Sequence, residues 1–534
     1  MSVRRLLNQH DGDPYSPTRG CFDRRFWGWK LIDFPEATFQ RNVQPLAEVW
    51  ADPRSPFYRD PTVLDAVITG LDYSSSIQHA DGSFDQAFPN ERSYAGTGFL
   101  LHSLCEAYKL IRPDASGLLR EKVAQCLKRA ADFLCRHDEK HGIISNHLAG
   151  VIVSLIKAAD LLGREPYRAR ALSLLKQLLE QQSSEGWFLE YDGADPGYQT
   201  LCLYYLAQIY LMEPSSHLER ALENAVDFLS HFVHPDGTFG GEYGSRRTTI
   251  YYPGGVALLS QQFPMAFSMT KAMVCSIAEG DTTTLVDIDM GNLAPLLANY
   301  LCLVQAKGLE ENSEPHPLPW EQPSIRKDFP EAGIVVRGTG YYYAIFGASN
   351  GGVMKVLHKR RRRLIWDDSG YIGETSRGVL VTTQMTIPGK AWVTKDDRIE
   401  GTRSFYRVLH SLPSPLRFLL LRGLCLTLMR NLRIGNLIKR GLVRLLISGK
   451  SRCDIQLQRR VRFEPDKVVV EDRLSKSHKV ELRWLQMGRR FVGIHMASAR
   501  YFQGREAEQS PPKIDLDSFN QQHQIDLRIV IDCA

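Results

Sequence analysis

Two short stretches of the chain combine side chains that can bind a carboxylate and move a proton. Asn146 and His147 stand at the start of one helical pattern, and Tyr198, 51 residues beyond His147, begins another. An amide and an imidazole both hydrogen bond to carboxylates, and a phenol becomes a useful base or acid when nearby cations lower its pKa from about 10. These three residues are the candidate catalytic groups. The same patterns allow Ser145 or Asn146 to be a helix cap and Tyr198 to be a core aromatic.

Each of these stretches follows a recurrent glycine turn. Four times an acidic or polar residue is followed by Gly and then, within two positions, by an apolar or aromatic residue, at Gly82, Gly142, Gly186 and Gly237. The steps between these glycines are 60, 44 and 51 residues, and helical pattern fills the intervals. Such spacing is typical of stacked helical hairpins, each turned by a glycine loop. Four such turns gathered on one rim would line a cleft.

The first and fourth turns also carry the candidate substrate-binding residues. Their arginines could hold an anion or lower the pKa of Tyr198, and each could equally be a solvated loop charge. The six candidates are Glu91, Arg92, Tyr94, Arg246, Arg247 and Tyr251.

The first half of the chain is predicted to be helical. Residues 61–306 have apolar positions at helical spacing, clearest in 148–162 and 201–210. The first 60 residues are rich in aromatic residues and Pro, which predicts an irregular arm packed on the body. Residues 307–330 contain five prolines and predict a linker.

The second half, 331–534, has a period of two, which is typical of strands. Residues 333–347 predict a hairpin, 378–385 a strand, and 459–472 two strands around a Pro-Asp turn. Helices followed by strands indicate two separate domains, a multidomain α-then-β protein.

The chain resembles the heparinase II/III-like polysaccharide lyases, which include related alginate lyases. The motifs that carry the likeness are 145–150, an Asn-His pair at a helix start, and 193–199, a Tyr after a Gly-rich turn. The resemblance implies an N-terminal incomplete (α/α) toroid of helical hairpins followed by a C-terminal antiparallel β-sandwich. It also implies that Asn146 neutralises a substrate carboxylate, that Tyr198 acts as base or acid, and that His147 assists.

The implied reaction is β-elimination in an acidic, uronate-containing polysaccharide. It removes the C5 proton beside the carboxylate, which is acidic enough only when the carboxylate charge is neutralised. A Tyr or His takes this proton, and a Tyr returns one to the leaving O4. A uronate C5-epimerase shares the first step and reprotonates C5, so the sequence does not separate the two enzymes.

One departure from the family concerns the β-domain. Lyases of this group often carry a Gly-His-x-His segment there, and the corresponding residues 348–358 lack it, with His358 reading as a surface residue. This departure leaves a second class of function open. The alternative is a non-catalytic or weakly active glycan-binding or assembly protein of exopolysaccharide biosynthesis at the inner membrane face.

A basic stretch interrupts the predicted strands. Residues 411–452 contain nine Lys or Arg and no Asp or Glu, and they predict a basic amphipathic helical insertion at about 412–449. Such a helix fits an anionic membrane surface or a lid over an acidic glycan. Alternatively, its apolar face simply packs on the body. Nucleic acid is not expected as a partner, since no recognised nucleic-acid-binding module accompanies the charge.

Composition indicates an ordinary globular protein. Of the 534 residues 43% are hydrophobic, and the net charge is +6. The ten cysteines are scattered without a C-x-x-C pair, which favours reduced thiols. The sequence shows neither a signal-peptide stretch nor an apolar window of membrane-spanning length. We therefore expect a cytoplasmic protein, and peripheral binding to the inner membrane is the second possibility. No cofactor and no metal are expected.

Overall fold

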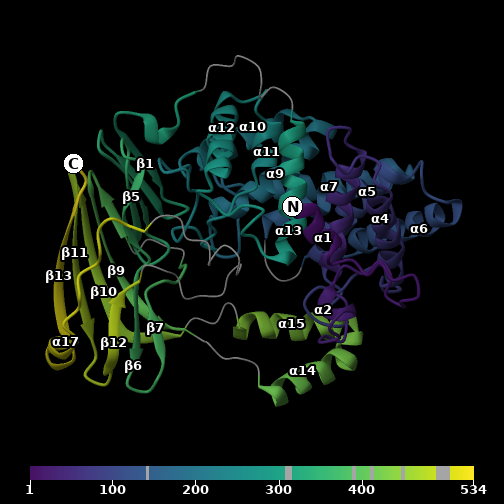
Figure 1. Cartoon of the computed structure of the whole chain (residues 1–534). Helices are drawn as coiled ribbons and strands as arrows, with labels where there is room; N and C mark the ends of the chain where they lie inside the picture. The colour runs from purple at the N-terminus through teal and green to yellow at the C-terminus, as the bar shows by residue number, and fades with distance from the viewer. Residues whose placement is uncertain (140–143, 307–315, 388–391, 409–413, 447–450, 489–505) are drawn as a thin grey trace.

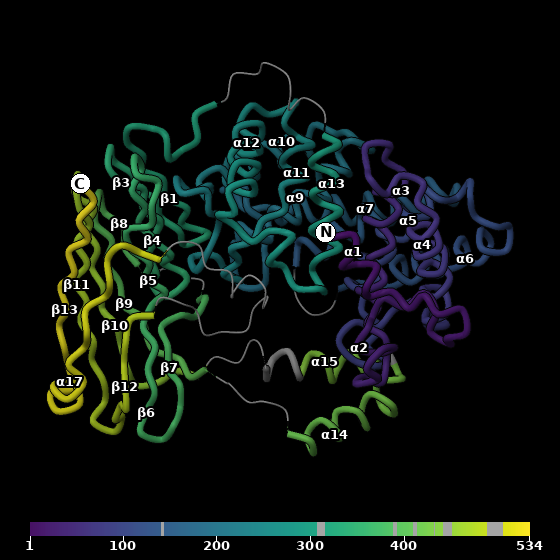
Figure 2. Tube along the Cα trace, in the orientation of Figure 1, coloured from purple at the N-terminus to yellow at the C-terminus, as the bar shows by residue number. Residues whose placement is uncertain are grey.

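The computed structural model describes residues 1–139, 144–306, 316–387, 392–408, 414–446, 451–488 and 506–534. Figures 1 and 2 show a helical body next to stacked sheets, with two further helices beneath the body. Most helices precede the strands along the chain, as the sequence predicts. The turn at Gly142 lies outside the described residues.

The helical body is a ring of hairpins with an inner and an outer layer. Inner helices contact one another in chain order, and the last packs against the first and against η1 (Ala37–Asn42), so the inner ring closes. The predicted toroid is therefore confirmed. The inner helices are α3 (Val43–Ala51), α5 (Tyr94–Ile111), α7 (Ser145–Leu162), α9 (Pro196–Met212), α11 (Pro253–Leu258) and α13 (Met290–Gln305). The outer helices are α4 (Pro61–Ser76), α6 (Gly117–Arg136), α8 (Glu165–Leu179), α10 (Ser216–Ser230) and α12 (Pro264–Glu279).

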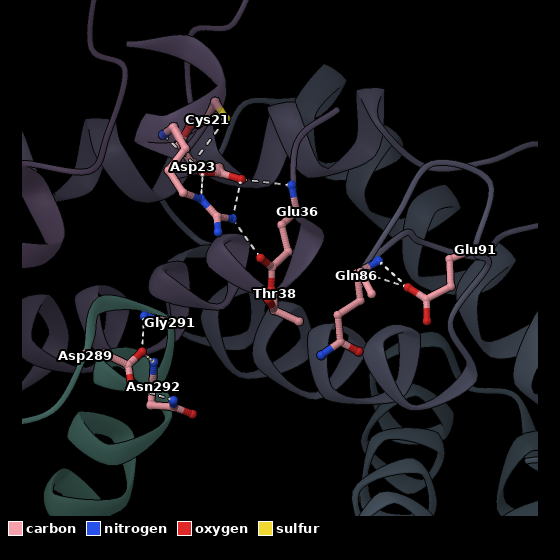
Figure 3. Close-up of polar contacts among 11 residues, drawn as sticks. Cys21, Asp23, Glu36, Thr38, Gln86, Glu91, Asp289, Gly291 and Asn292 are labelled. Atoms are coloured by element: carbon pink, nitrogen blue, oxygen red, sulfur yellow. Dashed lines mark hydrogen bonds and ion pairs between the residues drawn. The ribbon is translucent and has the colours of Figure 1, made fainter. Parts of the chain in front are cut away.

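Part of the predicted irregular arm belongs to this ring. The short helices α1 (Ser2–Leu7) and α2 (Arg24–Trp27) are joined by turns, and the Glu36 N–H donates to Asp23 Oδ2 at 3.1 Å (Figure 3). From Ala37 onward the chain forms η1 and α3, and Trp50 of α3 is buried in the core. The prediction of an irregular arm is wrong for residues 37–51, because their apolar spacing buries them against α5.

The glycine turns fix how closely the hairpins approach. Gly82 and Gly186 have φ values of +97° and +95°. A Cβ at Gly82 would lie 2.0 Å from the Arg129 carbonyl oxygen, and one at Gly186 would lie 2.2 Å from that of Asn224. Each glycine thus lets a turn contact the backbone of an outer helix, α6 or α10, which no other residue type permits.

Among the described residues, α7 is the one helix long and apolar enough to cross a membrane. Two thirds of it is buried inside the protein, between α5 and α9. A core helix passes the same test of length and composition, and this burial accounts for its apolar character.

Glu48 on α3 makes stability depend on pH. Its Oε1 accepts a hydrogen bond from Gln44 Nε2 at 2.9 Å, Oε2 is shielded from solvent, and burial raises the pKa of this carboxyl to about 8. The pKa of an unfolded Glu is about 4.3, so the folded state binds an extra proton between these values. Stability is therefore lost as the pH rises from about 4.3 through 8.

Glu48→Gln should remove this dependence. We expect a free energy of unfolding higher than wild type by about 2–4 kcal/mol at pH 8 and nearly equal at pH 4.5, because the shifted carboxyl is absent. Urea unfolding at both pH values checks this. Glu223→Gln, on the exposed face of α10, is the matched control and should change neither value. Equal effects of Glu48→Gln at the two pH values would contradict the prediction.

The β-domain consists of two antiparallel sheets. The first has the order β1-β2-β3-β4-β5, and the second has the order β12-β6-β7-β9-β10-β11-β13 with β8 beside β9. The first sheet comprises β1 (Ile325–Phe329), β2 (Ile334–Gly338), β3 (Tyr342–Gly347), β4 (Val353–His358) and β5 (Arg363–Asp368). The second comprises β6 (Tyr371–Thr375), β7 (Leu380–Thr382), β8 (Trp392–Lys395), β9 (Arg398–Arg407), β10 (Arg452–Phe463), β11 (Lys467–Lys476), β12 (Leu482–Met487) and β13 (Gln524–Asp532), with α17 (Leu516–Gln522) before β13.

The first sheet is the middle layer of the molecule. On β3, Tyr343 and Ile345 join the core of the helical ring, while Tyr342, Ala344 and Phe346 join the core between the two sheets. Both faces of the first sheet are covered, so β3 is buried along its whole length. Its sequence is accordingly a continuous apolar run without alternation. The predicted β-sandwich is confirmed, and one of its faces packs on the toroid.

The predicted strands agree with the observed pairs. The hairpin in 333–347 is the β2–β3 pair, with Ile334 opposite Gly347. The two strands around Pro465-Asp466 are β10 and β11, with Phe463 opposite Val468. The predicted linker is shorter than expected at its end, since η2 (Pro319–Glu321) and β1 already belong to folded structure, and 307–315 lie outside the described residues.

The basic insertion is helical, as predicted. Its described part consists of α14 (Pro415–Leu426), η3 (Leu428–Arg430) and α15 (Leu432–Leu446), while 412–413 and 447–449 lie outside the described residues. It leaves the second sheet between β9 and β10 and lies against the toroid beside α2 (Figure 1).

Candidate active site

Asn146 binds a buried glutamate and does not cap its helix. The cap residue of α7 is Ile144, and the Ser145 hydroxyl donates to the Leu189 carbonyl oxygen at 2.8 Å. The alternative in which Ser145 or Asn146 caps the helix is therefore wrong. The Asn146 amide Nδ2 lies 2.8 and 2.7 Å from Oε1 and Oε2 of Glu190, and the Asn146 backbone N–H donates to Oε1 at 3.0 Å.

The geometry of this contact leaves Asn146 one donor. Both carboxylate oxygens are near Nδ2, but the two N–H bonds of an amide diverge too widely for each to point at one oxygen of the same carboxylate. One N–H is therefore shared between the two oxygens, and the second can serve another acceptor. Burial raises the pKa of Glu190, which is fully buried, while Arg246 and Asn146 oppose this shift.

Arg246 joins Glu190 to Tyr198. Its Nη1 lies 3.6 Å from Glu190 Oε2, and its guanidinium carbon lies 3.5 Å from the centre of the Tyr198 ring. The same guanidinium is 4.8 Å from the ring of Tyr191, and the Arg246 side chain is 17% exposed. A cation stacked between two aromatic rings keeps a fixed position at the edge of solvent.

Tyr198 is a neutral phenol in this setting. Its residue is 6% exposed, and burial raises its pKa well above the ordinary value, with Arg246 acting in the opposite direction. A neutral phenol is a proton donor. The alternative in which Tyr198 is only a core aromatic is incomplete, because its ring is in van der Waals contact with a partly exposed cation.

Asp195 fixes the chain on both sides of this stack. It is the N-cap of α9, with Oδ1 accepting from the Tyr198 N–H at 2.9 Å. Its Oδ2 accepts from the Arg246 N–H at 2.8 Å. Asp195 is fully buried, and the turn after Gly193 is held further by Ser245, whose hydroxyl donates to the Glu190 carbonyl oxygen at 2.8 Å.

His147 lies at the solvent side of the α7 start. Its Nδ1 is 3.4 Å from Glu139 Oε2, and its ring packs edge-on against Phe99 at 5.5 Å between centroids. A carboxylate at Nδ1 favours the tautomer that carries the proton there, so Nε2 is the nitrogen that can accept one.

The first glycine turn contributes less than predicted. Glu91 Oε2 accepts from the backbone N–H groups of Gln86 and Ala87 at 3.0 and 2.6 Å, so its carboxylate closes its own loop (Figure 3). Arg92 pairs with Asp81 at 3.2 Å. Neither side chain is directed to Tyr198 or Asn146, and these two predictions of substrate contact have no support in the geometry.

Tyr94 and the basic insertion lie near the acidic residues that follow α6. Tyr94 begins α5 and is 7% exposed, near Asp138 and Glu139. Lys439 of α15 donates to the Glu91 carbonyl oxygen and is also near Glu139. Burial lowers the pKa of Lys439, and the two glutamates oppose this shift. The insertion thus reaches the same acidic group that orients His147.

Two predicted substrate-binding residues contact other parts of the protein. The backbone of Arg247 has φ +56°, and its Nη2 donates to the Gln384 carbonyl oxygen at 2.7 Å, so this arginine binds the β-domain. Tyr251 is 2% exposed and donates to the Met273 carbonyl oxygen at 3.0 Å inside the toroid. The side chains of Arg246 and Arg247 point in different directions because Arg247 adopts a left-handed backbone conformation. The sequence does not predict this conformation.

The β-domain presents Lys355 to the toroid. Lys355 of β4 lies 3.7 Å from Asp367, and Glu242 and Asp236 of the fourth turn are nearby. Burial raises the pKa of Asp367 to about 7, with Lys355 opposing the shift. His358 is buried, not a surface residue, and its Nδ1 accepts from the Arg360 and Arg361 N–H groups at 3.2 and 3.1 Å. It therefore caps a turn.

A metal-binding cluster and an open cavity are two further features that an active site can have. Within the described residues, no group of three or more His, Cys, Asp or Glu side chains is arranged to hold a metal ion. A cavity of about 600 Å³ lies between the fourth turn, α12 and η2, and includes His234, Lys271, Glu279 and Trp320 in its lining. None of the predicted site residues lines this cavity.

The chain is similar to polysaccharide lyases in its helical domain and in its fold. Residues 58–272 match the family model of the ulvan lyase N-terminal domain. A xanthan lyase from Paenibacillus superposes with a TM-score of 0.53 at 11% identity, covering 90% of this chain and 45% of that one. The chondroitin AC lyase of Streptomyces coelicolor A3, solved in complex with chondroitin sulphate, has a TM-score of 0.52 at 12% identity, covering 90% and 66%. No curated protein matches the chain.

These matches confirm the predicted resemblance to polysaccharide lyases of the toroid and β-sandwich type. The family match spans Asn146, Glu190, Tyr198 and Arg246, the cluster described above. The chain spans about half to two thirds of the length of the two solved lyases.

Proposed function

We propose that the protein is a lyase that cleaves an acidic, uronate-containing polysaccharide by β-elimination. The observation that carries this proposal is one cluster of four side chains. Asn146 and Tyr198 lie at the starts of the neighbouring inner helices α7 and α9, and Glu190 and Arg246 come from turns beside them. The cluster lies within residues 58–272, which match the family model of the ulvan lyase N-terminal domain.

The first task of the cluster is to neutralise a uronate carboxylate. Glu190 holds the Asn146 amide through its first N–H and lies 3.6 Å from the Arg246 guanidinium. The second N–H of Asn146 and the guanidinium are therefore two donors whose positions are set before the substrate arrives. Donors fixed in this way stabilise the negative charge that develops as C5 loses its proton.

The second task is proton transfer. His147 Nε2 accepts the C5 proton, because Glu139 holds Nδ1, and the neutral phenol of Tyr198 donates a proton to O4. The C5–H and C4–O4 bonds break, the C4–C5 double bond forms, and the proton lost by Tyr198 is recovered from His147 through solvent. The residues supply the acid, the base and the charge stabilisation that the reaction requires.

A panel of polysaccharides tests this proposal. Ulvan, chondroitin sulphate, xanthan and alginate are each incubated with the protein, and the ultraviolet absorbance of the unsaturated product is followed. We expect absorbance to rise with at least one of them. If the protein incorporates solvent deuterium at C5 without cleaving any chain, it is an epimerase. If it neither cleaves nor exchanges on any member of the panel, the lyase proposal is wrong.

A further inference from the structure

The basic insertion exposes an unusually large number of apolar side chains. Six residues of the twelve-residue helix α14 are large hydrophobics with more than a third of their surface in solvent, and Leu419 is 67% exposed. Similar exposure continues beyond this helix, with Leu437 of α15 at 65%. The exposed members are Leu416, Phe418, Leu419, Leu420, Leu424, Leu426, Leu428, Ile434 and Leu437. Exposed apolar surface of this extent is typical of a site that binds another protein, a ligand or a membrane.

The opposite side of the insertion is firmly held by the toroid. Cys425 and Met429 are buried, and Asn90 Nδ2 donates to the Cys425 carbonyl oxygen at 3.1 Å. Arg422 pairs with Asp33 at 3.0 Å, and Lys439 donates to the Glu91 carbonyl oxygen. Of the insertion's apolar side chains whose burial the structure describes, Cys425 and Met429 are buried on the body and nine are exposed. The alternative in which the insertion buries its apolar face on the body does not account for these nine.

A second segment adds to the same surface. Trp29 and Leu31 are 69% and 78% exposed, close in the chain to Asp33 and Phe34, which contact Arg422. Figure 1 shows α2, α14 and α15 grouped beneath the toroid, away from the sheets. Tryptophan is the residue enriched where an apolar phase meets water.

The charge of this surface is strongly positive. Residues 411–452 carry nine cations and no acidic residue in a chain whose net charge is +6, so the remainder of the protein is net acidic. Arg417, Arg430, Arg433 and Arg440 are exposed among the described residues. Lys30 next to Trp29 is exposed too.

We propose that the surface formed by Trp29, Leu31 and the exposed residues of α14–α15 docks on an anionic lipid bilayer. The leucines enter the boundary between headgroups and acyl chains while the arginines contact anionic headgroups. The surface lies on the bilayer and does not span it, since α14 has twelve residues where a span needs about 20.

Charge and chemistry favour a bilayer over other occupants. A second copy of the chain would bring two cationic surfaces face to face, which costs free energy at a two-fold interface. An acidic glycan would neutralise the arginines but would leave the leucines in water, because saccharides offer little apolar surface to aliphatic side chains. An anionic bilayer satisfies both groups at once.

Flotation of the full-length protein tests the proposal. Vesicles are made of phosphatidylcholine alone or mixed with phosphatidylglycerol, at low and high salt. We expect the protein to float with the mixed vesicles. Leu419→Glu/Leu420→Glu should weaken this binding at least tenfold, because each exposed leucine adds to the free energy of binding when it leaves water for the bilayer. Arg417→Gln/Arg433→Gln should weaken it about 30-fold at low salt and much less at high salt.

The matched control is Leu118→Glu/Leu211→Glu. It makes the same charge change at two exposed leucines of α6 and α9, and should float like wild type. The proposal is overturned if the intact protein does not float with mixed vesicles, or if Leu419→Glu/Leu420→Glu floats equally well. It is also overturned if sedimentation shows a dimer that this double variant dissociates. Activity on polysaccharides does not enter these readouts.

Discussion

Tyr198→Phe is expected to lower kcat by about 10²–10⁴-fold on whichever polysaccharide the protein cleaves, with little change in KM. The substitution removes one oxygen and keeps the ring that stacks on Arg246. The loss follows because the leaving O4 then departs without a proton. Initial rates of ultraviolet absorbance, measured over a range of substrate concentrations, separate kcat from KM.

The matched control for this experiment is Tyr204→Phe. Tyr204 lies on the same helix and is 6% exposed, as is Tyr198, so both variants lose a hydroxyl at equal burial. We expect Tyr204→Phe to retain wild-type kcat. Equal rates for wild type and Tyr198→Phe would remove the phenol from the reaction, and equal losses in the two tyrosine variants would assign the effect to folding.

Leaving-group chemistry offers a second check on Tyr198. If its proton is needed only to expel O4, a uronide whose C4 substituent departs without protonation, such as an aryloxy group or fluoride at C4, should lose far less rate in Tyr198→Phe than the polymer does. A merely structural role would reduce both rates alike.

The sequence predicted the elements well because their patterns are local. The apolar spacing of 148–162 and of 201–210 identifies α7 and α9, and the Pro-Asp turn identifies β10 and β11. Asn146, Tyr198 and Arg246 could be found in the same way, since each follows a glycine turn. The closure of the ring by α3 could not be predicted, because this helix has only nine residues and follows an irregular segment that hides its pattern.

The missed residues depend on contacts between distant segments. Glu190 is 44 residues from Asn146 and has the sequence context of an ordinary charged residue in a turn. The bridge between Ile144 and Glu190 brings the two segments together, and there Glu190 is fully buried. Its position directly after Trp187-Phe188-Leu189, an apolar run, is the one signal that could have found it. Asp195 carries a clearer signal, since an Asp before Pro at a helix start is a typical cap.

Asn146→Ala is expected to lower kcat by about 10²–10³-fold, the usual cost of removing one donor to a developing anion. It should also reduce the free energy of unfolding by about 1–3 kcal/mol, because Glu190 loses a hydrogen bond while remaining buried. Steady-state kinetics and urea unfolding measure the two effects separately. Asn299→Ala, a buried asparagine of α13 whose Oδ1 accepts from the Gly254 N–H, is the matched control. It should lose stability and keep kcat.

Glu190 acts through Asn146 and Arg246, and a double-mutant cycle tests this. Glu190→Gln keeps the volume but replaces one acceptor oxygen by a donor, so Asn146 and Arg246 lose their fixed positions and kcat should fall about 10–100-fold. If Glu190 works by holding Asn146, the double variant Asn146→Ala/Glu190→Gln should be little slower than Asn146→Ala alone. Additive losses would show that Glu190 does not act through Asn146, and they would leave Arg246 as the group that Glu190 positions.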